Sequence, residues 1–206
     1  MTSYDTESDL IEGLMRKDEQ AFRDAIRQYH PSMISLARSL TGHAIADEVV
    51  QESWFSVLKA LPKFEGRSTF KTWVLRIVAN EAKTRLRKEN RQTSLEAMTG
   101  DDPEMAGRFD QNGFWIDQPI GWDADSPDEL LSSGELKECM ERLLTTLPEQ
   151  QCATLNLREQ QGYSLAEICN ILEVSESNVR VLLHRARTRM FKCVEHFQDT
   201  GECCVD

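Results

Sequence analysis

The side chains of this sequence best suited to binding another molecule are basic and amide groups at helical spacing. On a helical wheel Arg76, Asn80, Lys83 and Arg87 share one side, at spacings of four, three and four residues. Arginine presents a planar fork of donors and lysine a point charge, and both suit phosphates and base edges. We therefore predict a nucleic-acid-binding face here, with an ordinary solvated basic face as the alternative.

Charge is distributed very unevenly along the chain. The net charge of the 206 residues is −11, yet the segment 63–91 holds nine basic and three acidic residues. A protein that binds duplex DNA on its own is usually basic overall. A chain whose positive charge is confined to two segments should bind free DNA poorly, and we expect it to need a large partner for delivery.

The second basic segment runs from residue 177 to residue 192, with five basic residues and no acidic one. A capping box at Ser164 and Glu167 starts a short helix before this segment. The short helix and the basic segment together predict a helix-turn-helix. Helical hairpins without a DNA role are also frequent. The candidate DNA contacts are the outward side chains of this segment together with Arg185, which lies to one side of them: Ser177, Arg180, Val181, His184, Arg185 and Arg187.

The end of the chain is rich in zinc-type ligands, namely Cys193, His196, Cys203 and Cys204. Their spacing is not typical of a zinc site, so no metal or other cofactor is assigned. Two hypotheses stay open: a frayed tail with surface thiols, or a metal- or redox-sensing tail. The acidic N-terminus does not resemble a secretory signal, so we expect a cytoplasmic protein, in which a disulfide framework is not expected.

Enzymatic function is not predicted. The sequence shows no nucleophile with a base in a plausible context, no paired carboxylates in an apolar setting and no glycine-rich phosphate loop. No apolar run approaches the ~20 residues that span a bilayer, which predicts no membrane insertion.

The elements that must position these side chains are helices. Residues 45–61 fit an amphipathic helix that stops at Pro62, and Ser68 or Thr69 is placed to cap a second helix over residues 70–90. Upstream, Asp18 starts a helical pattern that Pro31 is expected to interrupt. The apolar face of the 45–61 helix is predicted to comprise Val50, Trp54, Val57, Leu58 and Leu61.

These patterns predict an all-α fold of two small helical domains. The first covers residues 1–92, and the second, with the helix-turn-helix, covers residues 134–192. Residues 93–133 are acidic and lack helical periodicity, so we expect a flexible linker. Residues 193–206 form the cysteine- and histidine-containing tail.

Two segments resemble a known family. DEVVQESW and FEGRSTFKTWVLRIVANEAK are similar to the second conserved region of bacterial RNA polymerase sigma factors. The segment LPEQQCATLNLREQQGYSLAEICNILEVSESNVRVLLHRARTRM resembles the fourth region of the same family. The shortness of the chain points to the extracytoplasmic-function (ECF) group.

The resemblance implies a role for each candidate residue. Asp47, Gln51 and Glu52 would contact core RNA polymerase. The minus-ten promoter element would be opened and held by Lys63, Arg67, Ser68, Thr69, Arg76, Asn80, Lys83 and Arg87. The candidates from Ser177 to Arg187 would read the minus-thirty-five element, with Arg180 and Arg185 as the expected base readers and Val181 against a thymine methyl.

The resemblance further implies promoter DNA as a ligand and an anti-sigma factor as a partner. Two other functions remain as alternatives. A stand-alone helix-turn-helix regulator would bind duplex DNA tightly without polymerase. A metal or thiol sensor would depend on the C-terminal tail.

Overall fold

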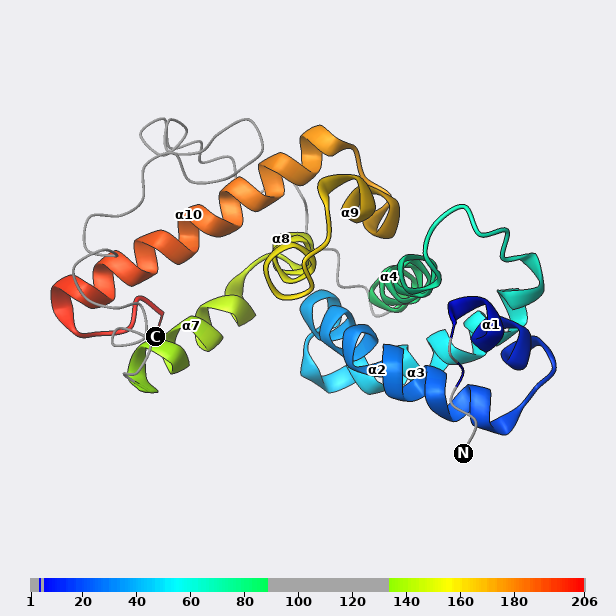
Figure 1. Cartoon of the computed structure of the whole chain (residues 1–206). Coiled ribbons are helices and arrows are strands. Elements are labelled where there is room, and N and C mark those ends of the chain that lie inside the picture. The colour runs from blue at the N-terminus through cyan, green and yellow to red at the C-terminus, as the bar shows by residue number, and fades with distance from the viewer. Residues whose placement is uncertain (1–3, 5, 89–133, 206) are drawn as a thin grey trace. The chain divides into compact units, whose positions relative to one another are not determined.

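The computed structural model describes residues 4, 6–88 and 134–205, and every helix or strand element in these ranges is helical (Figure 1). The expected linker, 93–133, lies outside the described residues. The elements are α1 Glu7–Met15, α2 Glu19–Thr41, α3 His43–Ala60, the 3-10 turn η1 Leu61–Lys63, α4 Phe70–Lys88, α7 Gly134–Thr146, α8 Glu149–Leu155, the π-helical turn η2 Asn156–Gln160, α9 Leu165–Leu172 and α10 Glu176–Thr200.

The chain divides into two compact units. The first comprises Met1–Gln92 and Asn156–Ser175, and the second comprises Thr93–Leu155 and Glu176–Asp206. The first unit therefore holds α1 to α4, η2 and α9, whereas α7, α8 and α10 belong to the second. The division into functional domains at residues 92, 134 and 192 stays a prediction.

Helix α2 runs through the proline at which the sequence predicts an interruption. It begins where the Asp18 carboxylate accepts hydrogen bonds from the N–H groups of Gln20 and Ala21, at 2.7 and 3.1 Å. Pro31 removes one helical hydrogen bond, which costs about 3 kcal/mol. Pro31 itself is exposed, and the burial of Tyr29 and Met33 beside it offsets that cost. The predicted interruption is therefore wrong.

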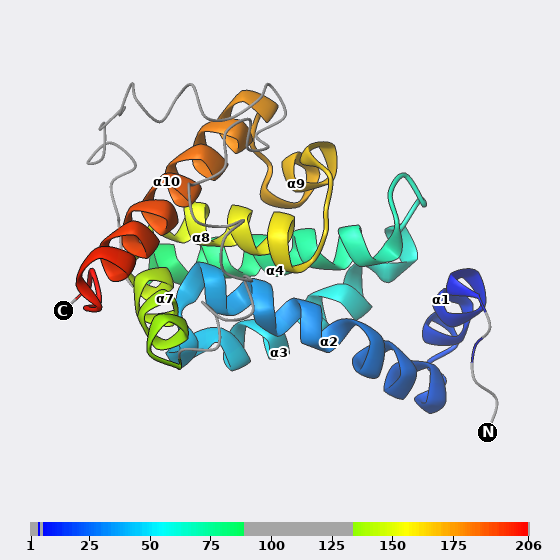
Figure 2. The ribbon, with the colours of Figure 1, turned by 60° about the vertical axis from the view of Figure 1, so that its left-hand side comes forward.

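Helix α3 packs one side against α2 and α4 (Figure 2). Val50, Trp54 and Val57 are buried as predicted, and the helix gives way to η1 at Leu61, next to Pro62. Leu58 was assigned to the same face but is 38% exposed, so that prediction is wrong. The buried side turns instead toward Ser53, whose hydroxyl donates to the Val49 carbonyl oxygen.

One local and one long-range hydrogen bond determine where α4 begins. The Thr69 hydroxyl oxygen accepts a hydrogen bond from the Thr72 N–H at 3.2 Å, so Thr69, rather than Ser68, is the cap. The Phe70 N–H donates to Oε1 of Glu7 at 3.1 Å, which ties α1 to the same helix end. A carboxylate is favourable at this end because the helix dipole is positive there.

Aromatic rings anchor the loop that precedes α4. Phe70 is fully buried, and its ring centroid lies 5.4 Å from that of Tyr29 and 5.5 Å from those of Phe64 and Trp73. The rings of Phe64 and Trp73 are 5.0 Å apart. Phe70 is thus a core residue, and Phe64 fastens the loop to the core.

The second unit is built on α10, which packs against α7 and α8. One apolar cluster joins Leu147, Leu155 and Ala186. A second joins Cys139, Leu143 and Cys193. The two clusters together bury one side of α10 along most of its length.

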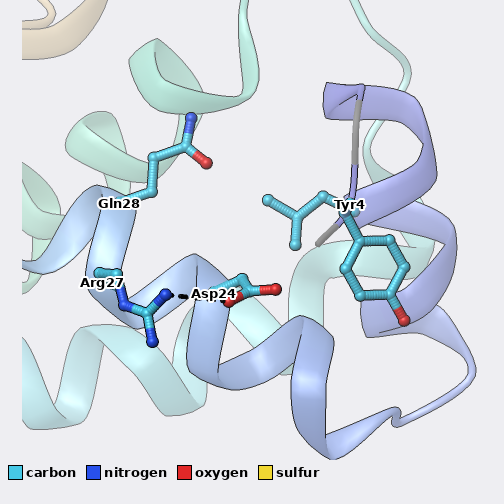
Figure 3. Close-up of a pocket in the computed structure, with 5 residues that line it drawn as sticks. Tyr4, Asp24, Arg27 and Gln28 are labelled. Carbon is cyan, nitrogen blue, oxygen red and sulfur yellow. Dashed lines mark ion pairs between the residues drawn. The ribbon is translucent and has the colours of Figure 1, made fainter. Parts of the chain in front are cut away.

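A pocket in the first unit lies between α2 and the segment around Tyr4 and Leu10 (Figure 3). It is lined by Asp24, Arg27 and Gln28 as well, and Arg27 pairs with Asp24 at 3.6 Å. Among the described helices none is sufficiently long and apolar to cross a bilayer.

The Pro31→Ala variant should be more stable than the wild type. Alanine restores the missing hydrogen bond, and part of the gain is offset by the greater freedom of the unfolded chain, so we expect an increase of about 2 kcal/mol in the free energy of unfolding. Urea denaturation measures this. Pro62→Ala is the matched control, because Pro62 lies in the first turn of η1. An equal gain in both variants would contradict the explanation.

Candidate nucleic-acid interface

The loop before α4 presents polar and basic side chains on the aromatic anchor described above. Lys63 and Arg67 are exposed, and Arg67 pairs with Glu65. The Ser68 hydroxyl donates to the Thr69 carbonyl oxygen at 3.2 Å. The loop therefore places two cations beside the start of α4.

The predicted face of α4 lies on the side away from its buried residues. Arg76, Asn80 and Arg87 are exposed and Lys83 is half-buried. We call these four side chains the α4 face. The structure thus brings together on one helix surface the residues that the spacing singled out.

Helix α9 lies beside α4 within the first unit (Figure 1), and its end contacts part of the α4 face. Nε and Nη2 of Arg76 lie 2.8 and 2.6 Å from Oε1 of Glu173. Nζ of Lys83 donates to the Leu172 carbonyl oxygen at 2.6 Å. Two of the four predicted DNA contacts are therefore engaged by the chain itself.

The end of α9 has a geometry that favours these contacts. Glu173 adopts a left-handed conformation with φ 56°, which costs a non-glycine residue about 1–3 kcal/mol. The Leu172 carbonyl belongs to the last turn, whose carbonyls lack helical partners, and Lys83 satisfies it. The hydrogen bond from Arg76 holds the pKa of Glu173 below its ordinary value of 4.5. Burial lowers the pKa of Lys83.

A separate surface lies on α3 within the same unit. Asp47, Gln51 and Glu52 are all exposed. Arg85 of α4 lies 2.7 Å from a carboxylate oxygen of Glu48 and 4.0 Å from one of Glu52. These ion pairs direct the Glu48 and Glu52 carboxylates toward Arg85, whereas Gln51 is an uncharged, exposed amide.

Two apolar residues on this surface were not predicted from the sequence to be exposed. Phe55 is 68% exposed and Leu58 is 38% exposed. They follow Gln51 by four and seven residues, so all three lie on one side of α3. The sequence did contain a signal for them, because Phe55 lies four residues, about one helical turn, after the polar candidate Gln51. We call Asp47, Gln51, Glu52, Phe55 and Leu58 the α3 surface.

The second basic segment forms the first half of α10. Val179, Leu183 and Ala186 are buried as predicted, and Met190 is partly buried. Val181 is 43% exposed, which agrees with its predicted outward position. Nη2 of Arg180 pairs with Oε1 of Glu176 at 2.5 Å. Ser177 is exposed, and the partly exposed candidates are Arg180, His184, Arg185 and Arg187.

The cysteines of the tail are bonded, contrary to the expectation of no disulfide framework. The structure contains the disulfides Cys139–Cys203 and Cys193–Cys204. The chain reverses at Gly201, with φ 71°, and so returns the last cysteines toward α7 and α10. Cys139 was missed because it is 64 residues from its partner. His196 is exposed on α10 and does not belong to the group of adjacent ligand atoms.

Comparison with known families and proteins gives a consistent result. The family model Sigma-70 region 2 matches residues 25–92, and the model Sigma-70, region 4 matches residues 137–190. Together they cover more than half of the chain.

Similar proteins span nearly the whole chain. The ECF RNA polymerase sigma-E factor of Salmonella typhimurium is 29% identical over 190 residues, which is 91% of this chain and 93% of the relative. The RNA polymerase sigma-H factor of Pseudomonas aeruginosa is 28% identical, over 95% of this chain and 97% of the relative.

Solved structures share the fold. The sigma factor RpoE from Bartonella quintana, in complex with the anti-sigma factor NepR, has a TM-score of 0.54 and 19% identity, covering 88% of this chain and 98% of that chain. CnrH in complex with the cytosolic domain of CnrY has a TM-score of 0.56 and 18% identity, covering 91% and 96%.

The Arg76–Glu173 pair should give stability a pH dependence. Because the pKa of Glu173 is lowered on folding, the pair stabilises at and above pH 4.5 and loses this effect as the pH falls through the lower folded pKa. Glu173→Gln should reduce the free energy of unfolding by roughly 0.2–1 kcal/mol at pH 7. Urea denaturation between pH 7 and pH 3 measures the difference, which should shrink toward low pH.

Glu138→Gln on α7 is the matched control, since Glu138 is exposed and belongs to the other unit. It should leave the pH profile as in the wild type. A deficit in Glu173→Gln that stays constant from pH 7 to pH 3 would contradict the role of the carboxylate charge.

Proposed function

The chain belongs to the extracytoplasmic-function group of RNA polymerase sigma factors, and we propose that it directs core polymerase to promoters through three surfaces. The main support for this proposal is the order of the two matched regions, 25–92 and 137–190, each of which has a basic helix face. The net charge of −11 supports dependence on a partner for DNA binding. The chain itself would bind and separate strands, whereas the polymerase would perform the chemistry. We expect it in the cytoplasm with the polymerase.

The α3 surface is the proposed contact with core polymerase. Gln51 and the exposed ring of Phe55 supply hydrogen-bonding and apolar contact area side by side. An aromatic side chain in the centre of an interface contributes more binding energy than most of its neighbours. Asp47 and Glu52 flank these two groups with negative charge, which would guide docking on a basic partner surface.

The loop 63–69 and the α4 face are the proposed minus-ten contacts. Arg76 and Lys83 hold oxygen acceptors of α9 in the free chain, and a phosphate would offer them acceptors of the same kind. The carboxylate of Glu173 carries negative charge where a phosphate would have to sit. We infer that α9 leaves the α4 face before DNA is held there, so promoter opening competes with a contact inside the chain.

The first half of α10 is the proposed reader of the minus-thirty-five element. A helix of this kind enters the major groove with its N-terminal residues toward the bases. Arg180 and Arg185 offer paired donors to guanine, His184 adds a polar contact, and Val181 offers an apolar contact to a thymine methyl. Arg180 would have to exchange Glu176 for its base.

We also propose control by an anti-sigma factor. The support is that a sigma factor of the same fold, RpoE from Bartonella quintana, was crystallised with the anti-sigma factor NepR. Such a partner would act by keeping the α3 surface and the DNA-binding faces from polymerase and promoter.

Substitutions on α3 and α4 should affect different steps. Gln51→Ala and Phe55→Ala should each weaken binding to core polymerase, by about tenfold or more for the aromatic residue. Arg87→Ala should leave that affinity unchanged and reduce strand opening at the minus-ten element. Affinity of the labelled chain for core polymerase and permanganate reactivity of unpaired thymines measure the two steps. If both classes lowered the same step, the assigned roles would be wrong.

Arg180→Ala should relax promoter choice. Loss of a bidentate arginine–guanine contact costs about 1–3 kcal/mol of discrimination at one base pair. Transcription from a library of promoter fragments measures this as tolerance at a single minus-thirty-five position. Arg142→Ala, at an exposed basic residue on α7, is the control and should leave the preference intact. A footprint of the chain on duplex DNA without polymerase would favour a stand-alone regulator instead.

A further inference from the structure

Four cysteines from three parts of the second unit meet at one place. Cys139 comes from α7, Cys193 from α10, and Cys203 and Cys204 from the segment after α10. We call them the cysteine cluster. Cys139 and Cys193 are 0% and 1% exposed, whereas Cys203 is partly buried and Cys204 is exposed. The cluster is therefore closed on the helix side and accessible from the tail side.

Three of the four sulfur atoms of the cluster are close enough to share one ligand. The Sγ atoms of Cys139, Cys193 and Cys204 all lie within 4.8 Å of one another. Those of Cys139 and Cys193, which are not bonded to each other, are 3.4 Å apart. The sulfur of Cys203 is bonded to that of Cys139 but does not belong to this group of three, so Cys203 would have to move toward the other sulfurs once its disulfide is reduced.

This spacing matches a tetrahedral thiolate site. With zinc–sulfur bonds of ~2.3 Å, two sulfurs of one tetrahedral site are ~3.8 Å apart. The separation of 3.4 Å between Cys139 and Cys193 needs only a small outward shift to reach it. The bonded sulfurs would separate once their disulfides are reduced.

The surroundings favour a metal over free thiolates. Leu143 is buried with the two helix cysteines, and the side chains packed around them include Met140, Met190 and Phe197. An isolated thiolate is disfavoured in such apolar surroundings, whereas a bound divalent cation neutralises it. The adjacent residues Cys203 and Cys204 pair with different helices, so the tail can offer both sulfurs to one centre.

We propose that the cysteine cluster of the reduced chain is a four-thiolate site for zinc. Reduction of each disulfide by a dithiol takes two electrons and two protons and leaves the reductant as its own disulfide. The four resulting thiols lose their protons as four bonds to one Zn²⁺ form. A site with four protein ligands has no open position and is structural, so the ion would fasten the tail and α10 to α7.

The test measures zinc in the full-length chain without polymerase or DNA. The chain is reduced with a non-chelating phosphine, given zinc sulfate and dialysed, and the zinc content is measured. We expect one zinc per chain, and in a parallel sample one cobalt(II) with the strong thiolate-to-metal absorption of a sulfur site. Zinc should also raise the melting temperature of the reduced chain, because only the folded state holds the complete site.

Cys139→Ser should lower zinc affinity at least tenfold, and so should Cys193→Ser. The matched control is Cys152→Ser on α8. Burial raises the pKa of the Cys152 thiol to about 11, and Cys152 packs in the other apolar cluster, so this change should leave zinc binding intact. Circular dichroism checks that each variant is folded.

Three results would overturn the proposal. The first is a reduced wild-type chain that retains no zinc. The second is a zinc affinity in Cys139→Ser and Cys193→Ser equal to that of the wild type, measured by competition with a chelator. The third is cobalt bound without thiolate absorption. Since none of these measurements involves promoter or polymerase, failure of the zinc site would leave the proposed function as it stands.

Discussion

Burial of one side of α4 is the constraint on which the first unit depends. Phe70, Val74 and Val78 are 0% exposed and pack against α2 and α3. Because α4 cannot rotate without exposing this apolar side, its opposite side has a fixed direction. The basic and amide groups of the α4 face inherit that direction. A helix with a rigid buried side can thus present donors with little loss of order on binding.

The same donors serve two contacts that cannot coexist. Arg76 and Lys83 hold a carboxylate and a carbonyl of the α9 end, and in the proposed function they hold promoter phosphates. The free energy that Arg76 and Lys83 contribute to DNA binding is therefore reduced by the free energy of the internal contact that they give up. The ion pair in that contact, Arg76 with Glu173, is exposed and therefore weak, since exposed ion pairs contribute about 0–1 kcal/mol. A weak internal competitor suits a protein that must exchange partners.

The charge of the chain and the redox chemistry of its cysteines affect different properties of the protein. The acidic balance of the chain leaves DNA affinity to the complex with polymerase, as the proposed function requires. In the second unit, disulfides or the proposed zinc ion connect the tail to α7 and α10 at the cysteine cluster. The first half of α10 is the proposed minus-thirty-five reader. Closure at one end of α10 would stiffen the packing of α7 against it without touching the DNA-binding half.

The sequence by itself determined the local features of this protein. The α4 face, the capping box of α9 and the cap at Asp18 follow from spacings of two to four residues, at which neighbouring positions on a helix are already defined. Only the tertiary structure decided that α2 continues through Pro31, that Leu58 is exposed, that Glu173 meets Arg76 and that Cys139 joins the tail. Glu173 and Cys139 lie 97 and 64 residues from their partners. Such contacts, like the burial of Leu58, depend on how helices distant in the chain pack, and periodicity within one helix carries no information about that.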